Sequence, residues 1–166
     1  MTIRTDSPDA TRAVAAALAS ILVAGDLVLL VGDLVLLMGE LGAGKTAFVQ
    51  GLARGLGVDE PVTSPTFTIV HEYEGRVRLA HVDVYRLERV QDLYDLGFDE
   101  LVDDGRVTVV EWGDRIEHLV PTEHLVVRIE PGAADNERVL ELTYHGARWH
   151  ERRELVEKLI DDGTRG

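Results

Sequence analysis

Residues 33–46 read DLVLLMGELGAGKT and combine the signals of a strand, a tight loop and the start of a helix. The apolar half of this stretch, Leu34 to Met38, is a short run typical of a strand that is buried on both faces. Its second half fits the pattern G-x-x-x-x-G-K-[ST], in which glycines let backbone N–H groups turn inward onto phosphates. A helical pattern follows from Ala47 to Leu56. The loop therefore has the preceding strand and the following helix that a phosphate-binding loop requires.

The last two residues of the motif carry its chemistry. Lys45 would reach the β and γ phosphates of a nucleoside triphosphate, and the Thr46 hydroxyl would ligate Mg²⁺. The helix that begins near Lys45 adds the positive end of its dipole. We therefore predict a nucleoside triphosphate site at this loop.

A metal at this site also needs carboxylates, and two strand-like runs supply them. In LAHVD, residues 79–83, alternation places His81 and Asp83 on one face of the strand. In VTVVEW, residues 107–112, Glu111 ends a buried strand. Ligands in open α/β sheets bind outside the carboxyl ends of parallel strands, so both carboxylates can converge on a magnesium ion held by Thr46. The alternative roles are a cap or edge carboxylate for Asp83 and an arginine partner for Glu111. We interpret His81 as a packed, hydrogen-bonded histidine, because magnesium prefers oxygen ligands.

The sequence of the strand before the loop occurs in two near-identical copies, GDLVLLV at 25–31 and GDLVLLM at 32–38. Only the second copy can feed the loop, because Gly39 follows Met38 directly. The first copy could form a hairpin with the second, fold over the sheet, or exchange with it by a seven-residue slip that swaps the two strand faces. A slip would separate the loop from its strand. We therefore expect the first copy to be an added segment without a role in catalysis.

The rest of the chain alternates between helical and strand patterns. Ser7 and Pro8 suggest a helix start, Gly25 a helix end, and Glu74-Gly75 a tight turn between strands at 67–73 and 77–84. We expect short helices within 87–104, a pair of strands at 125–130 and 138–144, and a final helix at 149–160. This pattern predicts an α/β fold with one domain over residues 1–166. Its sheet should be like that of P-loop NTPases, with a parallel core, antiparallel additions and flanking helices.

Composition narrows the possible environments and partners. The formal net charge is −13, with 30 acidic and 17 basic residues, which argues against independent binding to nucleic acid. The chain has no cysteine, so it has neither disulfides nor cysteine-ligated zinc. No apolar run is long enough to cross a membrane, and the first residues lack the pattern of a secretory signal. We expect a cytoplasmic protein that does not contact the membrane.

The segment Thr63 to Phe67 is a hydroxyl-rich loop stiffened by Pro65. Such a loop can sense a γ-phosphate by an order–disorder switch, or it can be an ordinary turn into a strand.

Taken together, these segments resemble the TsaE family, formerly called YjeE. The resemblance rests on GELGAGKTAFVQGLARGLGV, VTSPTFTIVHEY, HVDVYRL, LGFDEL and VVEWGDRI, in that order, and covers about residues 7–121. It implies a bacterial ATPase, with ATP and Mg²⁺ as cofactors, that is needed for threonylcarbamoyl modification of adenosine 37 in tRNAs reading ANN codons. It also implies action with the TsaD and TsaB proteins, with tRNA contacted only indirectly through that complex. HVDVYR stands where the family usually has HxDLYR, and the family has a single GD-strand run before the loop.

The resemblance also implies roles for individual residues. Lys45, Asp83 and Glu111 would be catalytic, and Thr46, Glu111 and Asp83 would hold Mg²⁺. Thr66 lies in the switch-like loop, and Trp112 matches an aromatic residue that shields or orients the site. The cofactor-binding residues would be Gly39, Leu41, Gly42, Ala43, Gly44, Lys45, Thr46, Thr66 and Trp112. Adenine contacts are expected from residues near 8–11 and 134–138.

Two other functions are compatible with the phosphate loop. A small-molecule kinase would share it but usually adds an arginine-bearing lid, and Arg115, Arg128, Arg138 and Arg148 do not cluster in the sequence. A non-catalytic, ATP-gated adaptor is the other alternative. The acidic stretch at 92–104 suits the basic surface of a partner or forms a solvated face.

Overall fold

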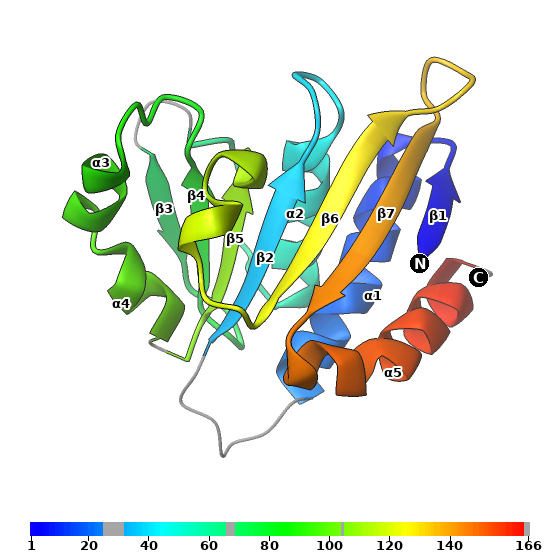
Figure 1. Ribbon diagram of the computed structural model, residues 1–166. Coiled ribbons are helices and arrows are strands. Elements are labelled where there is room, and N and C mark those ends of the chain that lie inside the picture. The colour runs from blue at the N-terminus through cyan, green and yellow to red at the C-terminus, as the bar shows by residue number, and fades with distance from the viewer. Residues whose placement is uncertain (25–31, 66–68, 104, 165–166) are drawn as a thin grey trace.

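The computed structural model describes residues 1–24, 32–65, 69–103 and 105–164, and a single seven-stranded sheet runs through it (Figure 1). The strands are β1 (Thr2–Thr5), β2 (Asp33–Met38), β3 (Val70–Tyr73), β4 (Leu79–Asp83), β5 (Val107–Glu111), β6 (His124–Pro131) and β7 (Arg138–His145). Their order across the sheet is β1-β7-β6-β2-β5-β4-β3. The four central strands β6, β2, β5 and β4 are parallel, while β3, β7 and β1 pair antiparallel at the edges. The predicted fold class, a parallel core with antiparallel additions, is confirmed.

Helices cover both faces of this sheet. They are α1 (Pro8–Ala24), α2 (Lys45–Gly55), α3 (Val90–Asp95), α4 (Phe98–Asp103) and α5 (Ala147–Thr164), with short 3-10 turns η1 (Gly113–Arg115) and η2 (Glu117–Leu119). One apolar core lies between the sheet and α1, α2 and α5, and the other lies beneath α3, α4 and the 3-10 turns. A sheet that is covered on both faces explains why its central strands are continuous apolar runs.

The second heptad copy forms the central strand β2, as predicted. All six residues of Asp33–Met38 are buried. Val35 and Leu37 face one core, whereas Leu34, Leu36 and Met38 face the other. The strand pairs with β5 on one side and β6 on the other, and the phosphate loop follows directly. The first copy, residues 25–31, lies outside the described residues.

Deleting residues 25–31 is expected to preserve ATP binding and to leave the free energy of unfolding unchanged or higher. The shortened chain still reads GDLVLLM before the loop, and this copy makes every strand pairing of β2. Urea denaturation and a nucleotide titration of the deletion variant would test this. Loss of folding or of nucleotide binding would mean that the first copy is an integral part of the fold.

Local signals place the first two helices as expected. The Ser7 hydroxyl accepts a hydrogen bond from the backbone N–H of Ala10 at 3.2 Å, so Ser7 caps α1 and Pro8 occupies its first position. α2 packs against α1 at Gly51, where an added Cβ atom would lie 2.2 Å from the carbonyl oxygen of Arg12. Glycine therefore allows this close approach of the two helices.

The C-terminal helix is fixed to the start of the central strand by charge. Asp33 begins β2, and its carboxylate lies 3.0 Å from Arg152 Nη1 and 3.2 Å from Arg148 Nη2. Arg148 also donates a hydrogen bond to the carbonyl oxygen of Gly32 at 3.2 Å. Because Asp33 is only 9% exposed, these contacts compensate a buried charge.

Two features differ from the sequence-based expectations. The strand β1 was not predicted; it pairs along the edge strand β7. The predicted hairpin at Glu74-Gly75 is confirmed, but its connection is longer than expected, because Tyr73 pairs with Leu79 and the loop spans residues 74–78. This longer loop is held by Arg76, whose backbone N–H and guanidinium donate to the carbonyl oxygens of Leu56 and Gly55 at the end of α2. The loop is therefore anchored to a helix that precedes it in the sequence.

Among the helices that the structure describes, none is long and apolar enough to cross a membrane.

Candidate functional site

The loop between β2 and α2 has the backbone shape that its glycines predict. Gly39 has φ 145°, and a Cβ atom there would lie 2.3 Å from the carbonyl oxygen of Ile129 on β6. Gly44 caps the start of α2 in the left-handed region, with φ 109°. The loop thus presents the first N–H groups of α2 at the carboxyl end of the sheet, where they can bind an anion.

Lys45 lies across this loop. Its ammonium group donates to the carbonyl oxygens of Gly39 at 2.7 Å and Glu40 at 2.9 Å. The Nζ atom also lies 3.8 Å from the centre of the Trp112 ring. Burial lowers the pKa of Lys45, and the carboxylates of Glu111 and Asp83 oppose that effect. The cation is therefore held at a fixed position above the loop.

Glu111 receives two hydrogen bonds on one carboxylate oxygen. The Thr46 hydroxyl lies 3.0 Å from Oε1, and His81 Nε2 lies 2.9 Å from the same atom. Both His81 and Glu111 are buried. The prediction that His81 is a packed, hydrogen-bonded residue is confirmed, and the contact fixes the orientation of Glu111.

Asp83 lies beside Glu111, because the two residues are register partners at the ends of the parallel strands β4 and β5. Its carboxylate accepts hydrogen bonds from the Ser64 hydroxyl at 3.2 Å and from the backbone N–H of Tyr85 at 2.9 Å. The Thr46 hydroxyl and the two carboxylates are hard oxygen donors of the kind that Mg²⁺ prefers. This donor set fits a magnesium ion.

Trp112 closes one side of the site in an unusual backbone conformation. Its φ of 64° and ψ of 38° are left-handed, which costs a residue other than glycine about 1–3 kcal/mol. The ring packs on Tyr85 with centroids 4.8 Å apart, and Arg115 donates a hydrogen bond to the Tyr85 carbonyl oxygen. This backbone conformation places the Trp112 ring against the ammonium group of Lys45.

A cavity of about 380 Å³ joins these groups. Its lining residues come from the phosphate loop, the ends of β4 and β5, and the loop before β3: Leu41, Gly42, Gly44, Lys45, Thr46, Ala47, Ser64, Asp83, Tyr85, Glu111 and Trp112. The side chain of Leu41 is 88% exposed at the rim. Apart from Gly39, Ala43 and Thr66, every site residue predicted from sequence lines this cavity. Gly39 and Ala43 belong to the same loop but do not line the cavity, and Thr66 lies outside the described residues.

Arg138 is a site residue that the sequence did not single out for this role. Its guanidinium donates to the carbonyl oxygens of Ala43 at 2.9 Å and Gly42 at 3.5 Å, so β7 supports the phosphate loop from the side. Arg138 lies within the segment expected to contact adenine, but its distance from the loop in the sequence gave no sign of this contact. The sequence patterns do not identify Ser64 or Tyr85 as site residues either, although Ser64 lies in the hydroxyl-rich loop at 63–67.

The sequence of this chain also matches a known protein family. The model of the family described as "Threonylcarbamoyl adenosine biosynthesis protein TsaE" matches residues 5–140. The chain belongs to the TsaE family. Membership of this family assigns the chain to threonylcarbamoyladenosine biosynthesis.

Individual members of the TsaE family are similar over most of the chain. The TsaE protein of Bacillus subtilis is 43% identical over 147 residues, which are 88% of this chain and 87% of that protein. The TsaE protein of Streptomyces coelicolor is 45% identical over 140 residues, or 80% and 88% of the two chains. The crystal structure of Bacillus subtilis YdiB matches with a TM-score of 0.77 and 36% identity, covering 95% of this chain and 94% of that one. The similarity thus includes the late strands β6 and β7, beyond the motifs recognised in the sequence.

Proposed function

We propose that this chain is a Mg²⁺-dependent ATPase that acts with TsaD and TsaB in the threonylcarbamoyl modification of adenosine 37 in ANN-decoding tRNAs. The observation that carries the proposal is the Thr46–Glu111 contact of 3.0 Å, with Asp83 beside it, at the start of α2. The loop N–H groups and Lys45 would bind the phosphates, and the oxygen donors would hold the metal. Trp112 and Tyr85 would cover the reacting phosphate, and the site would operate in the cytoplasm.

The carboxylates support hydrolysis rather than nucleotide binding alone. Mg²⁺ held by Thr46 and Glu111 would neutralise charge that develops on the phosphates in the transition state. Asp83, whose orientation is fixed by Ser64 and Tyr85, would assist the metal and orient the attacking water. An adaptor that only binds ATP would not need two oriented carboxylates at this position.

The arginines favour hydrolysis over transfer to a small acceptor. Arg138 contacts the phosphate loop, Arg148 contacts Asp33, and Arg115 contacts the Tyr85 carbonyl oxygen. Arg138 and Arg115 thus contact backbone oxygens beside the nucleotide cavity, whereas Arg148 lies at the start of β2. They do not form the lid that small-molecule kinases usually carry.

ATP turnover should be measured with the chain alone, with candidate small acceptors, and with added TsaB and TsaD. The expected result is slow turnover alone and a clear increase with the two proteins. ADP release that depends on a small acceptor would identify a kinase instead. Tight ATP binding without turnover in any mixture would identify an adaptor.

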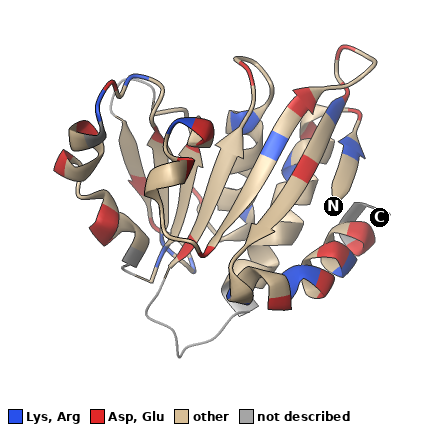
Figure 2. Ribbon diagram, viewed as in Figure 1, with Lys and Arg blue, Asp and Glu red and all other residues tan. Residues whose placement is uncertain are grey.

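Free tRNA is expected to bind the isolated chain no better than about 10⁻⁴ M at physiological salt, the weak end of non-specific binding. The formal charge is −13, and Figure 2 shows Lys and Arg scattered among Asp and Glu rather than gathered on one element. The acidic residues on α3 and α4 instead suit a basic protein surface (Figure 2). A filter-binding assay over a range of salt concentrations would check this. Tight, salt-sensitive binding without partners would contradict the charge argument.

A further inference from the structure

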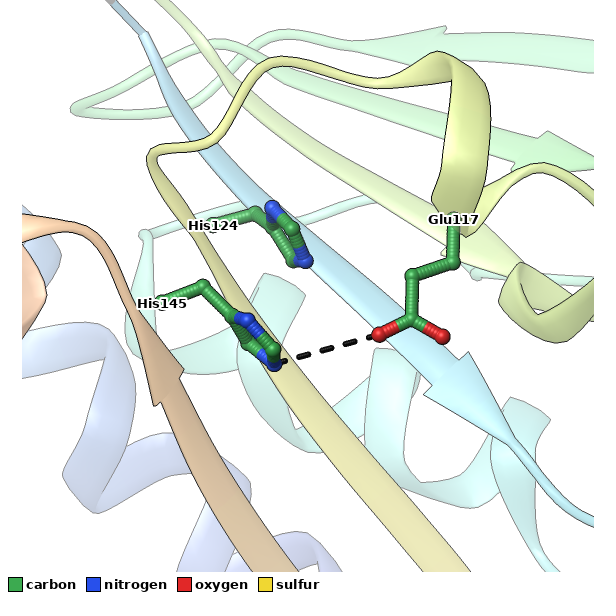
Figure 3. A group of neighbouring side chains, drawn as sticks. All are labelled: Glu117, His124 and His145. Carbon is green, nitrogen blue, oxygen red and sulfur yellow. Dashed lines mark ion pairs between the residues drawn. The ribbon is translucent and has the colours of Figure 1, made fainter.

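Three side chains able to ligate a metal meet at the start of β6. His124 begins β6, His145 ends β7, and Glu117 lies on η2. One ligand atom from each residue lies within 4.8 Å of the others, and Figure 3 shows the carboxylate facing the two imidazoles. Because β6 runs parallel to β2, this cluster lies at the opposite end of the sheet from the phosphate loop (Figure 1). It is therefore separate from the nucleotide site.

The strand pairing holds the two histidines together. His124 and His145 are direct register partners in the antiparallel pair β6–β7. Their rings stack with centroids 4.4 Å apart and an angle of 12° between their planes. Glu117 Oε1 lies 3.8 Å from His145 Nε2, an ion pair drawn as the dashed line in Figure 3. Tetrahedral bonds of about 2.0–2.1 Å require ligand atoms about 3.3 Å apart, so the two nearly parallel rings would have to rotate to direct their lone pairs at one ion.

His124 has the hydrogen-bonding pattern of a metal ligand. Its Nδ1 atom lies 2.7 Å from the carbonyl oxygen of Pro121, so Nδ1 carries the hydrogen and Nε2 keeps a free lone pair. The side chain is 5% exposed, and Nε2 has no hydrogen-bond partner among the described residues. A buried acceptor without a partner is unfavourable, and a metal ion would satisfy it. A backbone carbonyl that fixes the tautomer is also the usual outer contact of a ligating histidine.

The charges around the cluster also favour a cation. The other nearby carboxylate, Glu123, accepts the backbone N–H groups of Ala147 at 2.9 Å and Arg148 at 3.2 Å at the start of α5. Glu117 is thus the carboxylate that faces the imidazoles.

We propose that Glu117, His124 and His145 bind a divalent transition-metal ion, for which Zn²⁺ is the best match. Two imidazole nitrogens and one carboxylate oxygen suit zinc, whereas Mg²⁺ and Ca²⁺ prefer sites made of oxygen alone. Three protein ligands leave a fourth position for water. The ion would fasten η2 to the ends of β6 and β7, and η2 continues the segment that follows Trp112. Its binding would therefore stabilise the folded chain without occupying the nucleotide site.

The test is calorimetric titration of ZnCl₂ into the full chain, after chelator treatment and without nucleotide. We expect one tight equivalent per chain and a melting temperature raised by about 5–10 °C at a hundredfold excess over Kd. Glu117→Gln and His145→Gln should each weaken that site by at least about 100-fold. Both positions are partly exposed, so these variants should fold even if His124→Gln does not.

His118→Gln is the matched control, because His118 is an exposed histidine on the same 3-10 turn but outside the cluster. It should bind Zn²⁺ like the wild type, and all folded variants should keep their nucleotide affinity. The proposal is overturned if the wild type shows no tight equivalent. It is equally overturned if Glu117→Gln and His145→Gln, shown by circular dichroism to be folded, retain wild-type affinity. Zinc held instead by Glu111 and His81 would give that second result.

Discussion

Lys45→Ala is expected to reduce ATP turnover by at least about 10²–10³-fold and to weaken ATP binding, while the fold remains intact. The ammonium group lies over the phosphate loop, bonded to the carbonyl oxygens of Gly39 and Glu40. From this position it can neutralise the β and γ phosphates, and removing one such preorganised donor typically costs this much. Steady-state ADP release and a fluorescent nucleotide titration would measure the two effects.

Two further variants make this experiment specific. The chain has one other lysine, Lys158, which is exposed on α5, so Lys158→Ala is a matched control that should behave like the wild type. Lys45→Met keeps the length of the side chain against Trp112 but removes its charge, and should lose turnover as Lys45→Ala does. Unchanged turnover in both Lys45 variants would refute the assignment of the loop.

Glu111→Ala is expected to lower ATP turnover by roughly 10²–10³-fold and to weaken its dependence on Mg²⁺, with a smaller effect on nucleotide binding. A metal ligand contributes several kcal/mol to stabilising the transition state, and each 1.4 kcal/mol is about tenfold in rate. The loop N–H groups and Lys45 would still hold the phosphates. Turnover and nucleotide affinity should be measured across a magnesium titration.

The contacts of Glu111 make a second substitution necessary. Alanine would leave the buried His81 Nε2 and the Thr46 hydroxyl without their acceptor, so some loss could come from local rearrangement. Glu111→Gln keeps an acceptor oxygen and removes the charge, and it should still lose turnover. Glu141→Gln, at an exposed carboxylate on β7, is the control. If Glu111→Gln keeps wild-type turnover and magnesium dependence, Glu111 is structural and Asp83 alone must hold the metal.

Local patterns in the sequence were sufficient for the central strand and the loop after it. Residues 33–46 combine a buried apolar run, a glycine-rich turn and a helix start, and each is encoded within a few residues. The same holds for Asp83 and Glu111, since each directly ends a strand-like run. The parallel pairing of β4 and β5 then brought the two carboxylates side by side, because parallel strands end at the same edge of the sheet.

Contacts between distant segments required the tertiary structure. The edge strand β1 carries no strong periodicity in four residues, and it forms because β7 offers an unpaired edge. The connection at residues 74–78 is held by hydrogen bonds from Arg76 to the end of α2, a contact that the local pattern does not predict.

The phosphate loop, the strand before it and the carboxylates at the ends of neighbouring strands are predictable from sequence, because each depends on adjacent residues. Three contacts are visible only in the folded chain: Arg138 supports the loop, His81 orients Glu111, and Glu117 meets His124 and His145. These contacts join residues on different elements, and they depend on strand order, register and the path of the chain after β5. No local periodicity encodes those properties, because they arise when the apolar faces of all the elements are buried together.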